Sequence, residues 1–319
     1  MSRHAKTLYL FIILLLVSSG GLWAQQDPQF SQYMYNQSFF NPAAVGYEGM
    51  TRFQLIHRQQ YLGYQSSFSD DGGAPTTQLF TFQLPLPGIK SAVGLNVLND
   101  QAGPQRNQEV QLAYAYRIPL GGERTLAFGA QGGLLIRTID FDKLRARDPD
   151  DPLIGTGKVN ESNPDLAVGA HYSTPTYYVG ASMIHLNRAR YAFGQEGAIN
   201  AAQQTFFVNG GYRYYVNEEV EINPSAIFKS DINTFSIEAS LLAMWRNFVW
   251  VGAGWRQGDG IPVFAGVNWN RFRIGASYDI ILGGVSAKSP GSYSILLSYG
   301  LPAPKPNKRI PVRTPRFRF

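Results

Sequence analysis

The chain has 319 residues, no cysteine, a formal net charge of +6 and 13% aromatic residues. The lack of cysteine excludes a disulfide framework and any thiolate metal or nucleophile site. Apart from one N-terminal apolar run, no stretch approaches the roughly 18 residues that a membrane helix needs, which excludes a helical membrane protein.

Residues 1–24 have the pattern of a Sec signal peptide. Arg3 and Lys6 precede the apolar stretch LYLFIILLLV (8–17), and Ala24 supplies a small residue for cleavage. The apolar stretch is shorter than the ~20 residues of a membrane-spanning helix. The sequence therefore predicts export, and the absence of cysteine after the apolar region excludes a lipoprotein.

Residues 25–49 form a polar and aromatic segment that shows neither helical nor strand periodicity. Gln and Asn alternate irregularly with Tyr and Phe, and Asn41-Pro42 is a turn signal before the first alternating run. We expect this segment to lie on the periplasmic side of the strands that follow, as a separate N-terminal segment or a plug.

Residues 50–301 alternate apolar and polar side chains with the period of two that is typical of strands with unlike faces. In VQLAYAYRI (110–118), the apolar positions run from Val110 to Ile118, and Gln111 and Arg117 lie on the other face. The lengths match the ~9–11 residues of a tilted membrane strand. Fourteen strands are expected, at 50–59, 76–84, 90–99, 107–118, 124–139, 165–173, 176–186, 205–216, 220–229, 234–244, 248–256, 261–268, 272–280 and 292–301.

The connections support the same fold. Links after the even-numbered strands are short, whereas those after strands 1, 5, 7 and 13 are long or acidic: 60–75, 140–164, 187–204 and 281–291. Short periplasmic turns, long outer loops and an even strand count are typical of bacterial outer-membrane barrels. The sequence predicts an all-β protein, a transmembrane antiparallel outer-membrane β-barrel of about 14 strands, located in the cell outer membrane.

The inward face of this barrel is expected to be polar, because an arginine facing lipid costs about 2–4 kcal/mol at the membrane midplane. A satisfied polar network is favoured over a transport site for these side chains. The residues expected in the lumen or at its rim are Arg117, Glu238, Arg271, Arg273 and Asp279, together with Gln111 and Ser294.

Several motifs resemble the PorP/SprF family of outer-membrane proteins, which is associated with type IX secretion and gliding motility in Bacteroidota. The first, DPQFSQYMYNQSFFNPAAVG, is long and specific, while INPSAIFK, ASYDI and SPGSYSILLSY support it. The matching positions of the first motif are Asp27, Pro28, Phe30, Ser31, Gln32, Tyr33, Asn36, Asn41, Pro42, Ala43 and Gly46.

The resemblance implies a non-enzymatic barrel without a cofactor, acting as a scaffold or cargo-specific accessory for export or surface attachment of a large adhesin. The implied partners are the periplasmic ring and peptidoglycan-tethering components, besides the lipid of the outer membrane. The alternative is a diffusion channel for hydrophobic or small solutes, resembling the fatty-acid-transport barrels. Nucleic acid is not expected as a partner of an exported chain.

Two roles remain open for residues 25–49. Their amides and rings could plug a polar lumen from below, or their aromatic side chains could dock on a periplasmic ring protein. We favour the plug. The candidate residues are Asp27, Pro28, Phe30, Gln32, Tyr33, Asn36, Phe39, Phe40, Asn41 and Pro42.

Two further segments carry expectations of their own. Residues 302–319 hold five prolines and six Lys or Arg without an acid, which predicts an extended basic periplasmic tail. It suits an acidic partner or anionic headgroups, or it is solvated without a partner. Asp148, Asp150 and Asp151 are expected in a solvated acidic outer loop, since the ligand order of a calcium loop is missing.

Overall fold

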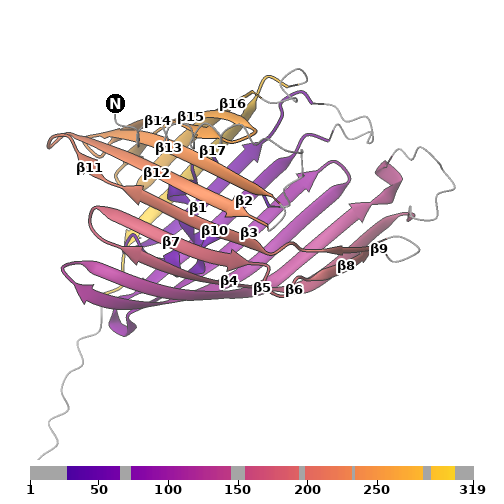
Figure 1. Ribbon diagram of the computed structural model, residues 1–319, viewed down its shortest axis with the longest axis horizontal. Coiled ribbons are helices and arrows are strands. Elements are labelled where there is room, and N and C mark those ends of the chain that lie inside the picture. The colour runs from indigo at the N-terminus through magenta and orange to yellow at the C-terminus, as the bar shows by residue number, and fades with distance from the viewer. Residues whose placement is uncertain are drawn as a thin grey trace, which may run out of the picture.

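The computed structural model describes residues 27–64, 73–144, 155–193, 198–231, 234–282 and 289–305 (Figure 1). The expected signal peptide, the acidic residues Asp148, Asp150 and Asp151, and residues 306–319 of the tail lie outside these ranges. Antiparallel strands pair in chain order around a complete ring, so the predicted 14-stranded barrel is confirmed. The ring closes where the first strand pairs with the last.

The wall has seven strands from the first half of the chain and seven from the second half. The short strand β11 pairs with β12 beside β10, and we count β10 and β11 as one wall strand. The first seven are β1 (Met50–Gln59), β2 (Thr76–Leu86), β3 (Ser91–Ala102), β4 (Gln105–Gly121), β5 (Arg124–Asp140), β6 (Lys158–Ser173) and β7 (Tyr177–Ile184). The others are β10 (Thr205–Tyr212) with β11 (Tyr214–Tyr215), β12 (Val220–Ser230), β13 (Phe235–Trp245), β14 (Val249–Arg256), β15 (Gly260–Trp269), β16 (Phe272–Ile281) and β17 (Ser292–Pro302).

The strand bounds differ from the predicted ones mainly at the long-loop end. Strand β6 begins at Lys158, inside the predicted loop 140–164, because its first residues are polar on both faces and gave no alternation. The predicted strand 205–216 breaks at Arg213 after two weakly strand-forming glycines, Gly210 and Gly211. The predicted loop 187–204 contains a hairpin of β8 (Arg190–Phe193) and β9 (Ala198–Ala201).

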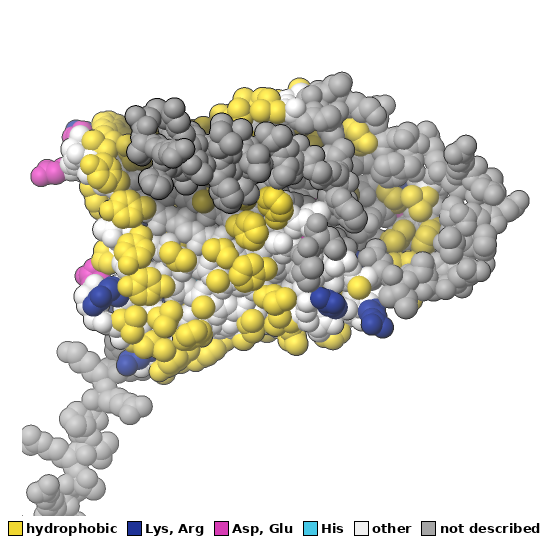
Figure 2. All heavy atoms as spheres, in the orientation of Figure 1, with side chains coloured by type: hydrophobic (Ala, Val, Ile, Leu, Met, Phe, Trp, Pro, Cys, Tyr) yellow, Lys and Arg dark blue, Asp and Glu magenta, His cyan; other side chains and the backbone are white. Residues whose placement is uncertain are grey.

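The two faces of the wall differ in chemistry. Outward side chains are apolar and exposed, such as Leu112 at 66% and Leu241 at 54%, whereas their inward neighbours Gln111 and Leu242 are buried. Figure 2 shows apolar side chains spread over one lateral face, with Lys and Arg toward its ends. No helix among the described residues is long and apolar enough to cross a membrane.

The two ends of the barrel are distinguished by their connections. At one end the turns are tight, such as Arg246 and Asn247, which join β13 to β14 with φ of 50° and 52°. These positive angles match the twist of a two-residue hairpin turn. The longer connections after β1, β5, β7 and β16 all lie at the other end. By the usual architecture, the tight-turn end is periplasmic and the long-loop end is outer.

Residues 27–49 lie inside the barrel, and we refer to them as the interior segment. Three short helical turns shape it: η1 (Tyr33–Tyr35), α2 (Gln37–Phe40) and η2 (Pro42–Ala44). The Asn41 side chain accepts a bond from the Ala43 amide and caps η2 ahead of Pro42. The segment starts beside the outer ends of β7, β10 and β12, and runs to the periplasmic end of β1.

Candidate functional site: the filled lumen

The centre of the lumen is an aromatic cluster supplied by the interior segment. Phe30 packs edge-on against Phe39, with ring centroids 5.5 Å apart, and Phe40 contacts Phe207 of β10 at 5.4 Å. Such edge-on and tilted pairs are favourable ring arrangements. The wall residues around this cluster come from eight strands: Ile56, Leu79, Leu98, Ala167, Ile184, Phe207, Ile227 and Leu296. The aromatic rings of the interior segment and these wall side chains therefore form an apolar core inside the barrel.

A glycine-lined seat receives the Asn41-Pro42-Ala43 triplet. A Cβ atom added at Gly129 of β5 would lie 2.3 Å from the Ala43 nitrogen, and one added at Gly169 of β6 would lie 2.1 Å from Asn41 Oδ1. Asn41 Nδ2 donates to the Ala170 carbonyl at 2.9 Å. The absence of side chains in the wall thus lets the backbone of the interior segment approach it closely.

Polar side chains of the wall bind the middle of the interior segment directly. Gln83 donates to Ser38 Oγ at 2.9 Å and accepts from the Gly46 amide at 2.8 Å. Ser182 donates to the Phe40 carbonyl at 2.8 Å. These bonds satisfy backbone and side-chain groups of a segment that lies away from water.

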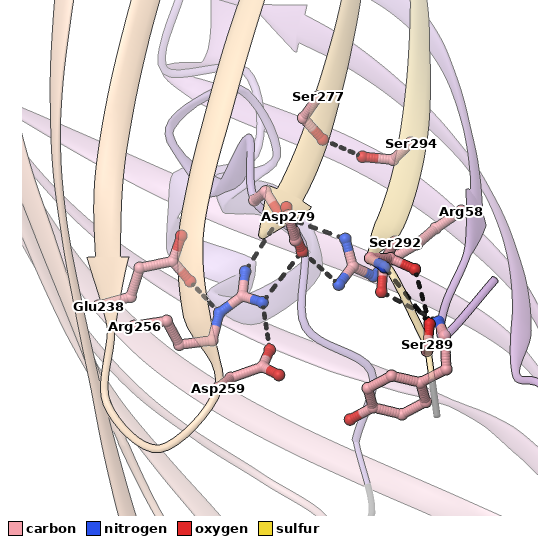
Figure 3. A network of polar contacts seen from close by, with 12 residues as sticks. Arg58, Glu238, Arg256, Asp259, Ser277, Asp279, Ser289, Ser292 and Ser294 are labelled. Carbon is pink, nitrogen blue, oxygen red and sulfur yellow. Dashed lines mark hydrogen bonds and ion pairs between the residues drawn. The ribbon is translucent and has the colours of Figure 1, made fainter. Parts of the chain in front are cut away.

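Near the outer end, Ser31 of the interior segment lies in an ion-pair cluster. Figure 3 shows the wall residues of this cluster, among them Arg58, Arg256 and Asp279. Ser31 donates to Asp279 Oδ1 at 2.6 Å and accepts from Arg58 and Arg256, each at 3.1 Å. Arg58 also reaches Asp279 Oδ2 at 2.6 Å. Four strands, β1, β13, β14 and β16, meet at this cluster.

Arg256 is the centre of that cluster. Its Nε donates to Glu238 at 2.8 Å, and its Nη1 donates to Asp259 at 2.8 Å and to Asp279 at 3.2 Å. The planar fork of arginine suits several carboxylates at once. Arg58 and Arg256 face three carboxylates, so the cluster has one carboxylate more than it has guanidinium groups, and one of the three, Asp259, is partly exposed.

The outermost contact of the interior segment is made by Asp27. His185 reaches Asp165 through Nδ1 at 2.9 Å and Asp27 through Nε2 at 3.0 Å. Since carboxylates accept, both ring nitrogens donate and the ring is the charged form. Asp27 also accepts from Thr205 at 2.8 Å, and its carbonyl accepts from Lys229 at 3.0 Å.

The electrostatics of this contact follow from burial and charge together. Burial opposes the charge of His185, but the Asp27 charge and the Asp165 hydrogen bond outweigh it and raise the pKa of His185 well above its usual value. Burial also opposes the charge of Asp27, yet Lys229 and His185 hold its pKa far below the usual range. The outer contact is therefore ionised at neutral pH.

At the periplasmic end, Glu48 anchors the interior segment to two strands. It pairs with Arg52 of β1 and with Arg273 of β16, the latter at 3.3 Å. The Arg273 guanidinium lies 4.1 Å from the centre of the Tyr35 ring, a cation–π distance. Burial would raise the pKa of Glu48, but Arg273 and Arg52 outweigh it and keep that pKa below its ordinary value.

Little space remains between the interior segment and the adjoining wall of β10, β12 and β13. The cavity there has a volume of about 30 Å³ and is bordered by apolar rings such as Phe30 and by the charged side chains Lys229 and Glu238. One or two water molecules fit in such a volume.

The structure places the residues expected from sequence as follows. Phe30, Tyr33, Phe39, Phe40, Asn41 and Pro42 are buried in the interior segment, as are Gln32 and Asn36, and Pro28 borders the small cavity. Tyr33 bonds Ser225 at 3.0 Å, and Asn36 accepts from Gln54 at 3.4 Å. Asp27 lies at the outer contact.

Of the wall residues expected to face inward, most meet the interior segment or its clusters. Glu238 and Asp279 belong to the Arg256 cluster, Arg117 donates to the Val45 carbonyl, and Arg273 binds Glu48. Gln111 donates to Asp165 at 2.8 Å, and Ser294 bonds Ser277 at 2.5 Å. Arg271 differs: it is exposed in the turn between β15 and β16.

Several important residues were not expected from sequence. Arg58 and Arg256 lie at inward positions near the outer ends of their strands. The alternation of each strand could have predicted that these two charged side chains face the lumen. The direction of the His185 side chain could not be predicted in this way, because His185 follows β7 and its backbone lies in the left-handed region, at φ 56°. The seat glycines Gly129 and Gly169 fall on inward positions of adjacent strands, a pattern visible only once the register is known.

Comparisons with known proteins agree with this architecture. The family model described as type IX secretion system membrane protein PorP/SprF matches residues 22–299. None of the curated proteins matches the chain. Among solved structures, the toluene transporter TbuX of Ralstonia pickettii is 11% identical with a TM-score of 0.50, covering 83% of this chain and 92% of that one.

A second structure, the CymD monoaromatic hydrocarbon channel, is 10% identical with a TM-score of 0.52, covering 85% of this chain and 93% of that chain. At such identities these two likenesses show the fold alone. The family match spans most of the sequence. The chain is an outer-membrane β-barrel and belongs to the PorP/SprF family of type IX secretion system membrane proteins.

Proposed function

We propose that this barrel serves type IX secretion as a closed scaffold or cargo-specific accessory rather than as an open pore. The observation that carries the proposal is the interior segment, which extends from Asp27 at the outer end to Glu48 at the periplasmic end. It is held by ion pairs at both ends and by the glycine-lined seat between them.

Moving the interior segment out of the lumen would be energetically costly. Breaking a buried ion pair by removing one partner costs about 3–5 kcal/mol, and the segment contributes a carboxylate at each end. Each buried Phe adds about 1.5–3 kcal/mol. These magnitudes support a resting state in which the lumen stays closed.

The partners proposed for this barrel are the periplasmic ring and peptidoglycan-tethering components, and a secreted adhesin. Membership of the family supports an association with the secretion machinery. The burial of Phe30, Tyr33, Phe39 and Phe40 favours the plug role of the interior segment over a docking role for these rings. Partner contacts would then lie on the turns of the periplasmic end, where Arg271 is exposed.

The alternative is a diffusion channel for hydrophobic or small solutes. It is supported by the fold shared with structures titled as a toluene transporter and a hydrocarbon channel, and by the apolar rings beside the small cavity. Against it stand a cavity of about 30 Å³ and the ion pairs that Asp27 and Glu48 form at the two ends of the interior segment.

A deletion strain with three complementing genes separates the two functions. The genes encode the native chain, a Phe39→Ala/Phe40→Ala variant that weakens the aromatic cluster, and a Phe206→Ala control whose outward side chain is exposed. Export of type IX cargo and uptake of a small aromatic hydrocarbon are measured in each strain. We expect deletion to abolish export of at least one cargo without reducing uptake.

The Phe39→Ala/Phe40→Ala variant is expected to raise uptake above the native level, and Phe206→Ala to match the native chain. Complete cargo export in the deletion strain, with reduced hydrocarbon uptake, would establish the channel and refute the scaffold.

A further inference from the structure

Along β1 to β4, the outward-facing side chains change from apolar to polar at the same height in all four strands, toward the outer end of the barrel. The register aligns residues of the four strands into rows, because each antiparallel pair continues into the next. Two apolar rows are Phe53, Phe82, Leu95 and Leu112, followed by Leu55, Phe80, Val97 and Val110. Two polar rows toward the outer end are His57, Gln78, Asn99 and Gln108, followed by Gln59, Thr76, Gln101 and Arg106.

The boundary between these rows marks the outer edge of the lipid-facing belt. An apolar outward band flanked by polar ends is how a barrel wall matches the hydrocarbon core of its membrane. The polar rows lie immediately beyond that band, at the depth of the outer-leaflet headgroups. Their side chains face away from the lumen, so they take no part in holding the interior segment.

The polar rows form a hollow rather than a flat surface. Its volume is about 520 Å³, and it is lined by six side chains of the polar rows together with Ala74 and Gly103. This volume lies within the ~300–1,000 Å³ of small-ligand sites. Among these lining residues, Arg106 alone is ionisable, and the other polar groups are amides and one hydroxyl.

The polar side chains are already ordered by bonds between strands. Thr76 donates to Gln59 Oε1 at 2.7 Å, Asn99 donates to Gln78 Oε1 at 3.4 Å, and Arg106 donates to Gln101 Oε1 at 2.9 Å. Side chains held in place this way lose less freedom on binding a ligand.

We propose that this hollow binds the sugar headgroup of an outer-leaflet glycolipid, with the acyl chains of the same molecule on the two apolar rows. Amides donate and accept, which suits the hydroxyls of a sugar. Arg106 supplies a cation for a headgroup phosphate, and the lining contains no carboxylate to repel it. The continuous apolar rows below the hollow favour a lipid-linked sugar over a free glycan or a polypeptide.

The test measures binding of a phosphorylated lipopolysaccharide to the purified full-length barrel in detergent, with its deacylated sugar as a second probe. The variants are Arg106→Gln and Gln78→Ala/Asn99→Ala. Arg124→Gln, an exposed arginine at the periplasmic end, is the matched control. Heat-modifiable migration confirms that each variant remains a folded barrel.

We expect lipopolysaccharide binding to weaken about tenfold in Arg106→Gln, as for loss of a charge-assisted hydrogen bond, and to stay unchanged in Arg124→Gln. Gln78→Ala/Asn99→Ala is expected to weaken it as well. The deacylated sugar is expected to bind more weakly than the intact glycolipid. Equal affinity for both probes would show a free-glycan site and overturn the proposal, as would unchanged binding in folded Arg106→Gln.

Discussion

His185 holds the outer end of the interior segment because its ring reaches two carboxylates at once. Asp165 and Asp27 lie on opposite sides of the ring, 20 and 158 residues away in the sequence. The backbone at His185 has a φ of 56°, a region that residues other than glycine rarely adopt. Two charged hydrogen bonds help to maintain that conformation.

This contact gives the interior segment a defined pH dependence. The pKa of His185 is raised above the ~6.5 of a free histidine, so its stabilising contribution is complete below that pH and is lost as the pH rises through the raised value. Asp27 acts in the opposite sense: because its pKa is lowered, its stabilising contribution is lost only at strongly acidic pH. We expect hydrogen exchange of residues 27–35, corrected for the intrinsic rate, to be faster at pH 10 than at pH 7.

Two variants test whether His185, rather than the neighbouring Lys229, is responsible for this effect. In His185→Gln the exchange at pH 7 should already be fast, and the step between the two pH values should shrink. His57→Gln, on the outward face of β1, should leave the native profile intact. Equal exchange rates in the native chain and His185→Gln at pH 7 would contradict this role.

At the scale of elements, the fit between η2 and strands β5 to β7 decides where the interior segment sits. Sequence periodicity predicted the strands, because alternation such as that from Val110 to Ile118 needs only neighbouring residues. It also predicted that Asp279 and Arg273 face inward. The seat could not be predicted, since Gly129 and Gly169 are 40 residues apart and become neighbours only through the register of β5 with β6.

Substituting one seat glycine tests this fit. Gly129→Val should displace the interior segment, because even its Cβ would lie 2.3 Å from the Ala43 backbone nitrogen. Overpacking of this kind costs about 1–3 kcal/mol. We expect higher conductance in planar bilayers, with the barrel still folded by heat-modifiable migration.

The matched control for this experiment lies on the same strand. At Gly132 an added Cβ would meet only Leu166 Cδ2, at an ordinary 3.5 Å, so Gly132→Ala should conduct like the native chain. If Gly129→Val and Gly132→Ala were equally closed, the seat would not control the position of the interior segment.

At the scale of the whole molecule, the barrel is a wall built around a polar and aromatic centre. Aromatic residues that sequence alone left open between two roles are buried here among eight strands. The choice depended on which side chains surround Phe39 and Phe40, and that depends on closure of the ring rather than on local pattern.

Thiol protection measures whether the centre stays filled in the cell. The native chain has no cysteine, so a Ser38→Cys thiol would be its single reactive sulfur. Ser38 is 1% exposed, and we expect that thiol to resist a water-soluble maleimide, whereas a Thr176→Cys thiol in an exposed turn reacts. Protection of the Ser38→Cys thiol should disappear when Gly129→Val is added. Rapid labelling without that second substitution would mean that the lumen is open.

The pairing of β1 with β17 also constrains the order of assembly. Met50 pairs with Pro302, so the ring cannot close before nearly all of the described chain is present. The interior segment precedes β1 in the chain and contacts wall strands from β1 to β17. We therefore expect the strands to pack against this segment as the wall is completed, so that the residues that close the finished lumen also guide its construction.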